Sequence, residues 1–374
     1  MSRIRKVKKR SKSTIIIIFA LGFLIGSIST NFILSSRGEK THITIIYSSE
    51  KASWMTIAYT NFMSEWKSTH PDEEISIDMH PYGSANSIIG ILNREIFPTI
   101  WSPASSIWMP LLNTKWADLT KSSVEIVNIS AAVKIIYSPI VIATWEAFNQ
   151  TYNIKGFSDV HNLILNPNVN IKMAHTDPRL SNSGFMSVIM ALSAASGTPS
   201  ENLTMADLTN SSNQQWLKQF ESSAITYGTS TGFLARYMKN EGPSSLNIVM
   251  LYENLIRDIS STSTGGKVIA IYPEEGTLYS DHPFCILNAD WIDDDQKEVA
   301  KAFLNYLQKT KTVESALEYG FRPINSSISL DPEVFNYESN GIAFNLTVPE
   351  LNTPIDGEVL LKIPDLWLLC RATA

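Results

Sequence analysis

The sequence has few cysteines, few histidines and no glycine-rich phosphate loop, and each scarcity excludes a class of protein. Its 374 residues include two cysteines, Cys285 and Cys370, which excludes a disulfide-rich scaffold or a multi-cysteine zinc module. Whether these two cysteines pair stays open. The six histidines include no pair four residues apart and no H-E-x-x-H motif, so we expect neither a metal site nor a cofactor.

Excess basic charge is also missing from the chain as a whole. The formal net charge of -6 argues against a nucleic-acid binder, yet residues 1–36 carry seven basic residues and no acidic one. A content of 44% hydrophobic and 18% charged residues indicates a globular protein. At about 100–200 residues per domain, the length suggests two domains or lobes.

The N-terminal segment contains the one long apolar run of the sequence. No charged residue occurs from Ser13 to Ser36, and a stretch of about 20 apolar residues can cross the hydrocarbon core of a bilayer. The basic residues before it place that end in the cytoplasm. No A-x-A-like cleavage site is evident, so residues 1–37 are expected to form a basic cytoplasmic tip and an uncleaved transmembrane signal-anchor. A cleaved signal peptide is the alternative.

An exported body could carry glycans. Six N-x-S/T sequons begin at Asn128, Asn149, Asn202, Asn210, Asn325 and Asn345. Because a chain rich in Asn, Ser and Thr forms such triplets by chance, they agree with a cell-surface glycoprotein but do not establish one.

Short β-branched runs alternate with helical patterns in the first half of the body. Strands are expected at 41–47, 75–79 and 99–101, and helices at 52–67 and around 88–92. Such alternation predicts a parallel sheet covered by helices. Since ligands bind beyond the carboxyl ends of parallel strands, Ser48, Ser49, Ser84 and Ser102 are expected at one edge.

The second half repeats this alternation. Strands are expected at 140–144, 169–174, 247–251 and 267–272, an apolar helix at 185–195 and a further helix at about 296–309. No long Gly/Ser linker separates the halves. The sequence therefore predicts two α/β lobes with a cleft between them.

The order of the turn motifs resembles a known family. Ser48-Ser49, Tyr82-Gly83-Ser84, Trp101-Ser102-Pro103, His175–Pro178, Tyr252-Glu253 and Pro273–Gly276 follow one another as in extracellular solute-binding proteins of the type II periplasmic-binding fold. The similarity covers roughly residues 41–325 and is nearest to the molybdate and sulfate receptors. Residues 98–112 resemble a subgroup sometimes fused to von Willebrand factor A domains, although no such domain fits in this chain.

The resemblance implies an α/β fold of two lobes that close on a ligand and an ABC permease that receives it. Lobe one would comprise 41–138 plus 280–374, including a last helix within 354–367, and lobe two would comprise 139–279. The body would lie outside the cell, anchored as a single-pass membrane protein, and would have no catalytic site.

The candidate ligand site follows from the same turns. Ser and Thr hydroxyls before helices, with the free N–H groups of helix N-termini, can hold an oxyanion such as molybdate, tungstate or sulfate; ordinary helix capping is the other interpretation. Glu253 does not fit an anion, and aromatic residues such as Trp108 would suit a sugar, so a sugar or peptide stays open. The candidate ligand-binding residues are Ser48, Ser49, Ser84, Ser102, Thr176, Ser181, Ser183, Ser230, Tyr252 and Glu253.

Two other functions remain as alternatives. One is a surface ligand-sensing module that works with a von Willebrand factor A-type partner. The other is a serine hydrolase, because residues 228–232 match G-x-S-x-G around Ser230, and Asp258 and His282 follow in the required order. No oxyanion-hole glycine cluster precedes that match. Ligand identity, permease partner, glycan occupancy and oligomeric state are not fixed by the sequence.

Overall fold

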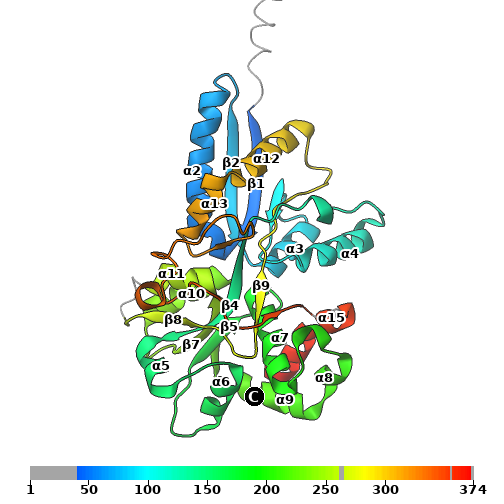
Figure 1. Cartoon of the computed structure of the whole chain (residues 1–374). Helices are drawn as coiled ribbons and strands as arrows, with labels where there is room; N and C mark the ends of the chain where they lie inside the picture. The colour runs from blue at the N-terminus through cyan, green and yellow to red at the C-terminus, as the bar shows by residue number, and fades with distance from the viewer. Residues whose placement is uncertain (1–39, 261–264, 354–355, 372–374) are drawn as a thin grey trace, which may run out of the picture.

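The computed structural model describes residues 40–260, 265–353 and 356–371, which form two α/β lobes joined by crossing strands (Figure 1). None of the helices in these ranges is long and apolar enough to cross a membrane. The predicted signal-anchor, residues 1–37, lies outside the described residues.

Lobe one is built around a four-stranded sheet in the order β10-β3-β1-β2. Its strands are β1 (Thr41–Ser48), β2 (Ile75–Tyr82), β3 (Ile100–Ser102) and β10 (Cys285–Ile286). Helices α2 (Ala52–Thr69), α3 (Ser84–Leu92), α4 (Trp108–Thr120), α12 (Asp294–Leu307) and α13 (Thr310–Leu317) surround it. The strands and helices that the sequence predicts here are confirmed.

The register of lobe one brings the polar turns to one edge. β1 runs parallel to β2 and β3, with Ser48 opposite Tyr82 and Tyr47 opposite Ser102. All three strands therefore end at the same side of the sheet, as the sequence predicts. The short helix η1 (Ser49–Lys51) and α3 begin there.

Lobe two contains a larger, mixed sheet in the order β12-β9-β4-β7-β5-β6, with β8 and β11 also paired to β4. Its strands are β4 (Ile136–Trp145), β5 (Met173–Thr176), β6 (Ala224–Gly228), β7 (Ile248–Tyr252), β8 (Val268–Ile271), β9 (Thr277–Ser280), β11 (Arg322–Pro323) and β12 (Glu350–Leu351). The strand expected at 169–174 begins only at Met173. β5 is parallel to β6 and β7, and β4 is antiparallel to β7, β8 and β9.

The helices of this lobe cover the larger sheet. They are α5 (Glu146–Tyr152), α6 (Phe157–Leu165), α7 (Asn182–Ser196), α8 (Met205–Thr209), α9 (Ser211–Glu221), α10 (Thr231–Glu241), α11 (Glu253–Ser260), α14 (Tyr337–Asn340) and α15 (Gly357–Arg371). Short helices η2 (Ile129–Ala131) and η3 (Ser200–Asn202) lie in connections. All of α7 from Asn182 to Ser193 is buried, which explains its continuous apolar sequence.

Strands β4 and β9 carry the chain between the lobes. Ser138 pairs with Ser280 and Pro139 with Tyr279, in antiparallel register. The segment before β4 still contacts lobe one, where Val133 bridges to Phe284. The chain crosses a third time between α13 and β11, and β11 pairs with β4, with Arg322 opposite Tyr137. Three adjacent segments therefore form the connection, and β4 and β9 enter lobe two side by side (Figure 1).

The C-terminal helix lies on the other lobe from the one expected. Helix α15 packs against α7, α8 and α9 (Figure 1), and its Trp367 donates a hydrogen bond to Glu221. β12 likewise pairs with β9. The assignment of the last residues to lobe one is thus wrong: an apolar helical face does not encode which of two sheets it will cover.

A buried ion pair fixes β11 and the loop after α14 against α11. Arg322 donates from Nε and Nη2 to the two carboxylate oxygens of Glu253, at 2.7 and 2.8 Å. Its remaining donors reach the backbone oxygens of Ala343 and Phe344. Both side chains are almost completely buried, at 3% and 0% exposure, so each charge depends on the other.

Breaking this pair should cost much more than breaking an exposed one. We expect Arg322→Met to lower the free energy of unfolding by about 3–5 kcal/mol, because it leaves the Glu253 charge buried without a partner. The double variant Arg322→Met/Glu253→Gln should be less destabilised than the single one. Lys362→Ala, which breaks an exposed pair with Asp365, should cost less than about 1 kcal/mol. Urea unfolding measures all three, and equal losses for Arg322→Met and Lys362→Ala would contradict the account.

Candidate functional site

Six hydroxyl side chains from both lobes meet where the lobes contact each other. Ser49 of lobe one hydrogen-bonds Ser230 of lobe two, with 3.0 Å between the oxygens. Thr231 Oγ1 lies 2.6 Å from Ser183 Oγ, which lies 2.7 Å from Thr176 Oγ1. Ser181 lies 3.4 Å from Thr231. We call these the hydroxyl cluster: Ser49, Thr176, Ser181, Ser183, Ser230 and Thr231, all buried.

Three serines in or beside this cluster start helices without capping them through their own side chains, whereas Ser49 and Thr176 accept from the Gly232 and Gly184 backbones at the starts of α10 and α7. Ser48, Ser181 and Ser230 occupy the N-cap positions of η1, α7 and α10, yet none makes a side-chain capping hydrogen bond. Elsewhere in this chain the N-cap side chains of Asn210 and Asp293 do cap their helices. Capping therefore does not account for serine at these three positions, where Ser181 and Ser230 bond other hydroxyls instead.

An amide on α7 extends the contact across the lobes. The Asn182 side chain donates to the Tyr252 hydroxyl at 2.9 Å and to Ser280 Oγ at 3.0 Å. Its oxygen accepts from the Trp108 indole of lobe one at 2.7 Å. The sequence predicts Tyr252 here but misses Asn182 and Ser280, because their partners are 70 to 98 residues away in the chain.

Two predicted residues serve lobe one internally. Ser84 accepts a hydrogen bond from the Ala104 backbone at 3.0 Å. Ser102 accepts from the buried Lys51 ammonium, which also donates to the carbonyl oxygens of Ser102 and Pro103. Burial lowers the pKa of Lys51 to about 7 from its ordinary value, although the nearby Glu50 carboxylate opposes this shift. Both serines lie at the predicted sheet edge but outside the hydroxyl cluster.

Behind the cluster, several buried polar atoms lack a well-formed hydrogen bond. They are the hydroxyl of Ser48, Glu50 Oε1, Asn254 Oδ1 and both ring nitrogens of His282. Glu50 Oε1 and His282 Nδ1 lie 3.3 Å apart, and His282 has a left-handed backbone with φ of 40°. Burial alone would raise the pKa of Glu50, but His282 and Lys51 lower it below its ordinary value. Buried orphan groups and local backbone strain together are typical of functional sites.

Glu253 does not join these groups. Both of its oxygens are held by Arg322, and the Tyr272 hydroxyl also donates to it. The expectation that it binds ligand is corrected by this pairing: its carboxylate is already satisfied, and it neither repels an anion in the cleft nor attracts a cation there.

The three residues that a serine hydrolase would need, Ser230, His282 and Asp258, are not hydrogen-bonded to one another in the part of the chain that the structure describes. Ser230 hydrogen-bonds Ser49, whereas His282 pairs with Glu50 and contacts the Tyr252 ring at 5.8 Å between centroids. Asp258 accepts from the exposed Ser53 hydroxyl. No hydrogen bond among the described residues joins Ser230, His282 and Asp258, so the required relay from nucleophile to base is missing.

Two glycines allow the lobes to approach this closely. A Cβ on Gly83 of lobe one would lie 2.5 Å from the Leu180 carbonyl oxygen and 2.7 Å from that of Thr229, both in lobe two. A Cβ on Gly232 would lie 2.8 Å from the Ser49 carbonyl oxygen. The Leu180 carbonyl also accepts a hydrogen bond from the Asn86 backbone. The structure is thus a closed arrangement of the two lobes.

Comparison with known families identifies most of the body. Residues 43–322 match the family described as bacterial extracellular solute-binding protein. No curated protein sequence matches the chain significantly.

Solved structures with the same fold include several binding proteins. AfuA from Actinobacillus pleuropneumoniae, with fructose-6-phosphate bound, is 14% identical at a TM-score of 0.59, covering 90% of this chain and 100% of AfuA. The spermidine/putrescine-binding protein PotD from Streptococcus pneumoniae is 11% identical at 0.58, covering 89% and 99%. A tagatose-bound solute-binding protein from Thermotoga lettingae is 12% identical at 0.59, covering 89% and 94%. At such identities the likeness shows a two-lobed periplasmic-binding-protein fold and no ligand.

A methyl group at the lobe contact should hold the lobes apart. We expect Gly83→Ala to disfavour the closed arrangement, because its Cβ would overlap two backbone oxygens that cannot move as side chains do. Small-angle X-ray scattering should then give a larger radius of gyration than for the parent chain. Gly357→Ala is the matched control, since its Cβ meets nothing within 4 Å. An unchanged radius for Gly83→Ala would contradict a closed parent.

The buried lysine should make stability rise with pH. With a pKa of about 7 in the folded chain and an ordinary value of 10.5, Lys51 binds a proton on unfolding between these pH values. Raising the pH from 7.5 to 8.5 should therefore increase the free energy of unfolding of the parent by up to about 1.4 kcal/mol more than that of Lys51→Met.

Urea unfolding at the two pH values measures this difference. Lys309→Met, which removes a half-exposed lysine, should behave as the parent does. If Lys51→Met shows the same pH dependence as the parent, Lys51 stays protonated in the fold.

Proposed function

The chain belongs to the bacterial extracellular solute-binding proteins, and we propose that it holds a small polar ligand, an oxyanion in the favoured case, between its lobes. Members of this family are generally receptors for transporters and not enzymes. We propose that this chain delivers its ligand to the permease of an ABC importer. The proposed ligand-binding residues are those of the hydroxyl cluster, with Ser48, Asn182 and Tyr252.

One observation carries this proposal: hydroxyl side chains of both lobes meet at the N-termini of α7 and α10, where Ser49 of lobe one hydrogen-bonds Ser230 and accepts from the Gly232 backbone of lobe two. Their hydroxyls can rotate to donate to a ligand, while helix N-termini favour negative charge. Without ligand, the hydroxyls of Ser49, Ser183, Ser230 and Thr231 satisfy each other. A ligand that enters the opened cleft would replace these mutual hydrogen bonds when the lobes close.

A neutral polar solute such as a sugar is the second candidate. The buried Glu50 carboxylate has an oxygen without a well-formed hydrogen bond and would repel an anion that reached it, whereas it would accept from a ligand hydroxyl. Trp108 lies beside the cluster, with its ring 5.2 Å from that of Phe185. The two candidates differ in whether the ligand approaches the helix N-termini or Glu50.

The N-terminal segment completes the proposed arrangement. Residues 13–36 would anchor the protein in the membrane as a single-pass signal-anchor, with the body outside the cell, where a receptor without an anchor would diffuse away. We further propose that β4, β9 and the crossing into β11 form the hinge and that lobe two includes α15. A surface module that works with a von Willebrand factor A-type partner would use the same closure without delivering solute.

Thermal unfolding of the full chain against a panel of ligands tests the proposal. The panel contains molybdate, tungstate, sulfate, simple sugars, short peptides and polyamines. A ligand at 100 times its dissociation constant adds roughly 2.7 kcal/mol to the folded state, so the midpoint should rise. We expect the rise with an oxyanion; a rise with sugars alone would favour the second candidate.

Variants locate the site. Ser183→Leu fills the hydroxyl cluster and should abolish the ligand-induced rise in the unfolding midpoint. Ser49→Ala adds no bulk and should make that rise smaller. Ser68→Ala removes an exposed hydroxyl that bonds only within α2 and should leave it unchanged. The proposal fails if no ligand shifts the midpoint, or if Ser49→Ala and Ser183→Leu respond to the ligand as the parent does.

A further inference from the structure

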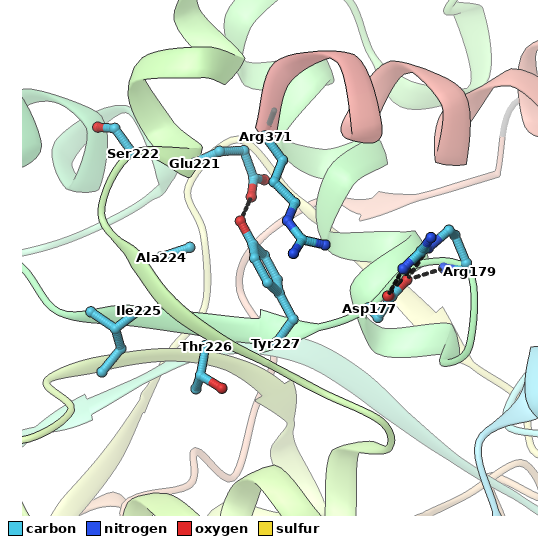
Figure 2. Close-up of a pocket in the computed structure, with 9 residues that line it drawn as sticks. All are labelled: Asp177, Arg179, Glu221, Ser222, Ala224, Ile225, Thr226, Tyr227 and Arg371. Carbon is cyan, nitrogen blue, oxygen red and sulfur yellow. Dashed lines mark hydrogen bonds and ion pairs between the residues drawn. The ribbon is translucent and has the colours of Figure 1, made fainter. Parts of the chain in front are cut away.

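A second hollow lies on lobe two, away from the contact between the lobes. It has a volume of about 630 Å³, within the range of small-molecule sites. Its lining comes from the turn after β5, the end of α9, the edge strand β6 and the last residue of α15 (Figure 2). No lining residue belongs to lobe one, so this pocket is separate from the hydroxyl cluster.

Both carboxylates at this pocket, Asp177 and Glu221, already have partners within lobe two. Arg179 holds Asp177 through Nε and Nη2, with the shortest contact at 2.5 Å. Glu221, 2% exposed, lies 3.1 Å from His175 and accepts from the Tyr227 hydroxyl at 2.8 Å. Figure 2 shows the Asp177–Arg179 pair and the Glu221–Tyr227 pair on opposite sides of the hollow.

The Arg371 guanidinium contacts aromatic rings in this pocket and has no carboxylate paired with it among the described residues. Its guanidinium lies 4.6 Å from the Tyr227 ring and 5.0 Å from the Trp367 ring, and extends between Tyr227 and the Asp177–Arg179 pair (Figure 2). Within residues 40–260, 265–353 and 356–371, it makes neither a hydrogen bond nor an ion pair. Burial alone would raise the pKa of Asp177, but Arg179 and the more distant Arg371 lower it. Asp177 therefore interacts electrostatically with both guanidiniums, although only that of Arg179 hydrogen-bonds its carboxylate.

Stacking prepares Arg371 to bind. An arginine that lies on aromatic rings has a fixed plane, and its N–H groups point outward from the edge of that plane. This fork matches the two oxygens of a carboxylate or phosphate group. The hydroxyl of Thr226 also lines the hollow and adds a neutral donor.

We propose that this pocket is a second ligand site, which binds a small molecule bearing a carboxylate or phosphate group through the Arg371 guanidinium. Arg179 keeps the neighbouring Asp177 carboxylate neutralised, and the Tyr227 ring packs against Arg371. The site does not depend on the proposed function, because it lies within lobe two. Only one turn separates the two sites, since Asp177 follows Thr176 of the hydroxyl cluster.

Titration calorimetry of the full chain with citrate and with inorganic phosphate, at 0.15 M salt, tests the site. We expect saturable binding of at least one of these probes. Arg371→Gln should weaken it about tenfold or more, because it removes a charge-assisted pair of hydrogen bonds. Arg371→Lys keeps the charge without the fork and should give an intermediate loss. The comparison of the two probes distinguishes a carboxylate from a phosphate ligand.

The matched control is Arg236→Gln. Arg236 is also exposed and also stacks on a ring, 4.6 Å from Phe233, but it does not line the pocket. The Arg236→Gln variant should bind the probes as the parent chain does, and so should Ser183→Leu at the cleft. The inference is overturned if neither probe binds, if Arg371→Gln and Arg236→Gln weaken binding equally, or if Ser183→Leu abolishes it. The first two results leave the cleft proposal standing.

Discussion

The pairing of β4 with β9 is the constraint on which the rest of the structure depends. Ser138 and Ser280 face each other where these strands pass between the lobes, and residues far apart in sequence meet beside them. Ser280 bonds Asn182, Ser138 Oγ accepts from the Asn254 backbone, and His282 lies two residues after Ser280. Because β4, β9 and the paired β11 lie side by side and can bend together, the connection allows closure without unfolding either lobe.

The contact between the lobes combines many polar groups with an aromatic contact between Trp108 and Phe185. Hydroxyls bond hydroxyls, and Trp108 bonds Asn182 across the contact. Such groups exchange readily with water when the lobes separate, because each can form equivalent hydrogen bonds in solvent. Gly83 and Gly232 let the backbones touch without interlocking side chains. The same features that permit closure therefore keep it reversible, which a protein that takes up and releases solute requires.

Local sequence patterns predict most of the fold. β-branched runs and helical spacing placed β1, α2 and α7 correctly, since each element buries its own apolar residues. The position of α15 was missed, because Val359, Ile363 and Trp367 would form an apolar face against either lobe. Only the tertiary partner, Glu221 for the Trp367 indole, decides between them.

In the candidate site too, the positions of polar residues could be predicted from local sequence, whereas their hydrogen-bond partners could not. Serines at turns after strands were predictable, because a parallel sheet brings those turns together. Asn182 lies between Ser181 and Ser183 in the sequence, but nothing local distinguishes a side chain that links the two lobes from one that faces solvent. Glu253 was misjudged because Arg322, 69 residues later, satisfies it. Sequence predicts where polar groups gather, whereas their pairing depends on contacts that only the folded chain defines.

The most direct test of the account is a distance between the lobes measured with and without ligand. Single-molecule fluorescence transfer between dyes at positions 68 on α2 and 212 on α9 suits it, since both sites are exposed and both native cysteines are buried. The account predicts two interconverting distances for the free chain and a shift to the shorter one with a binding solute. One unchanging distance under both conditions would contradict it.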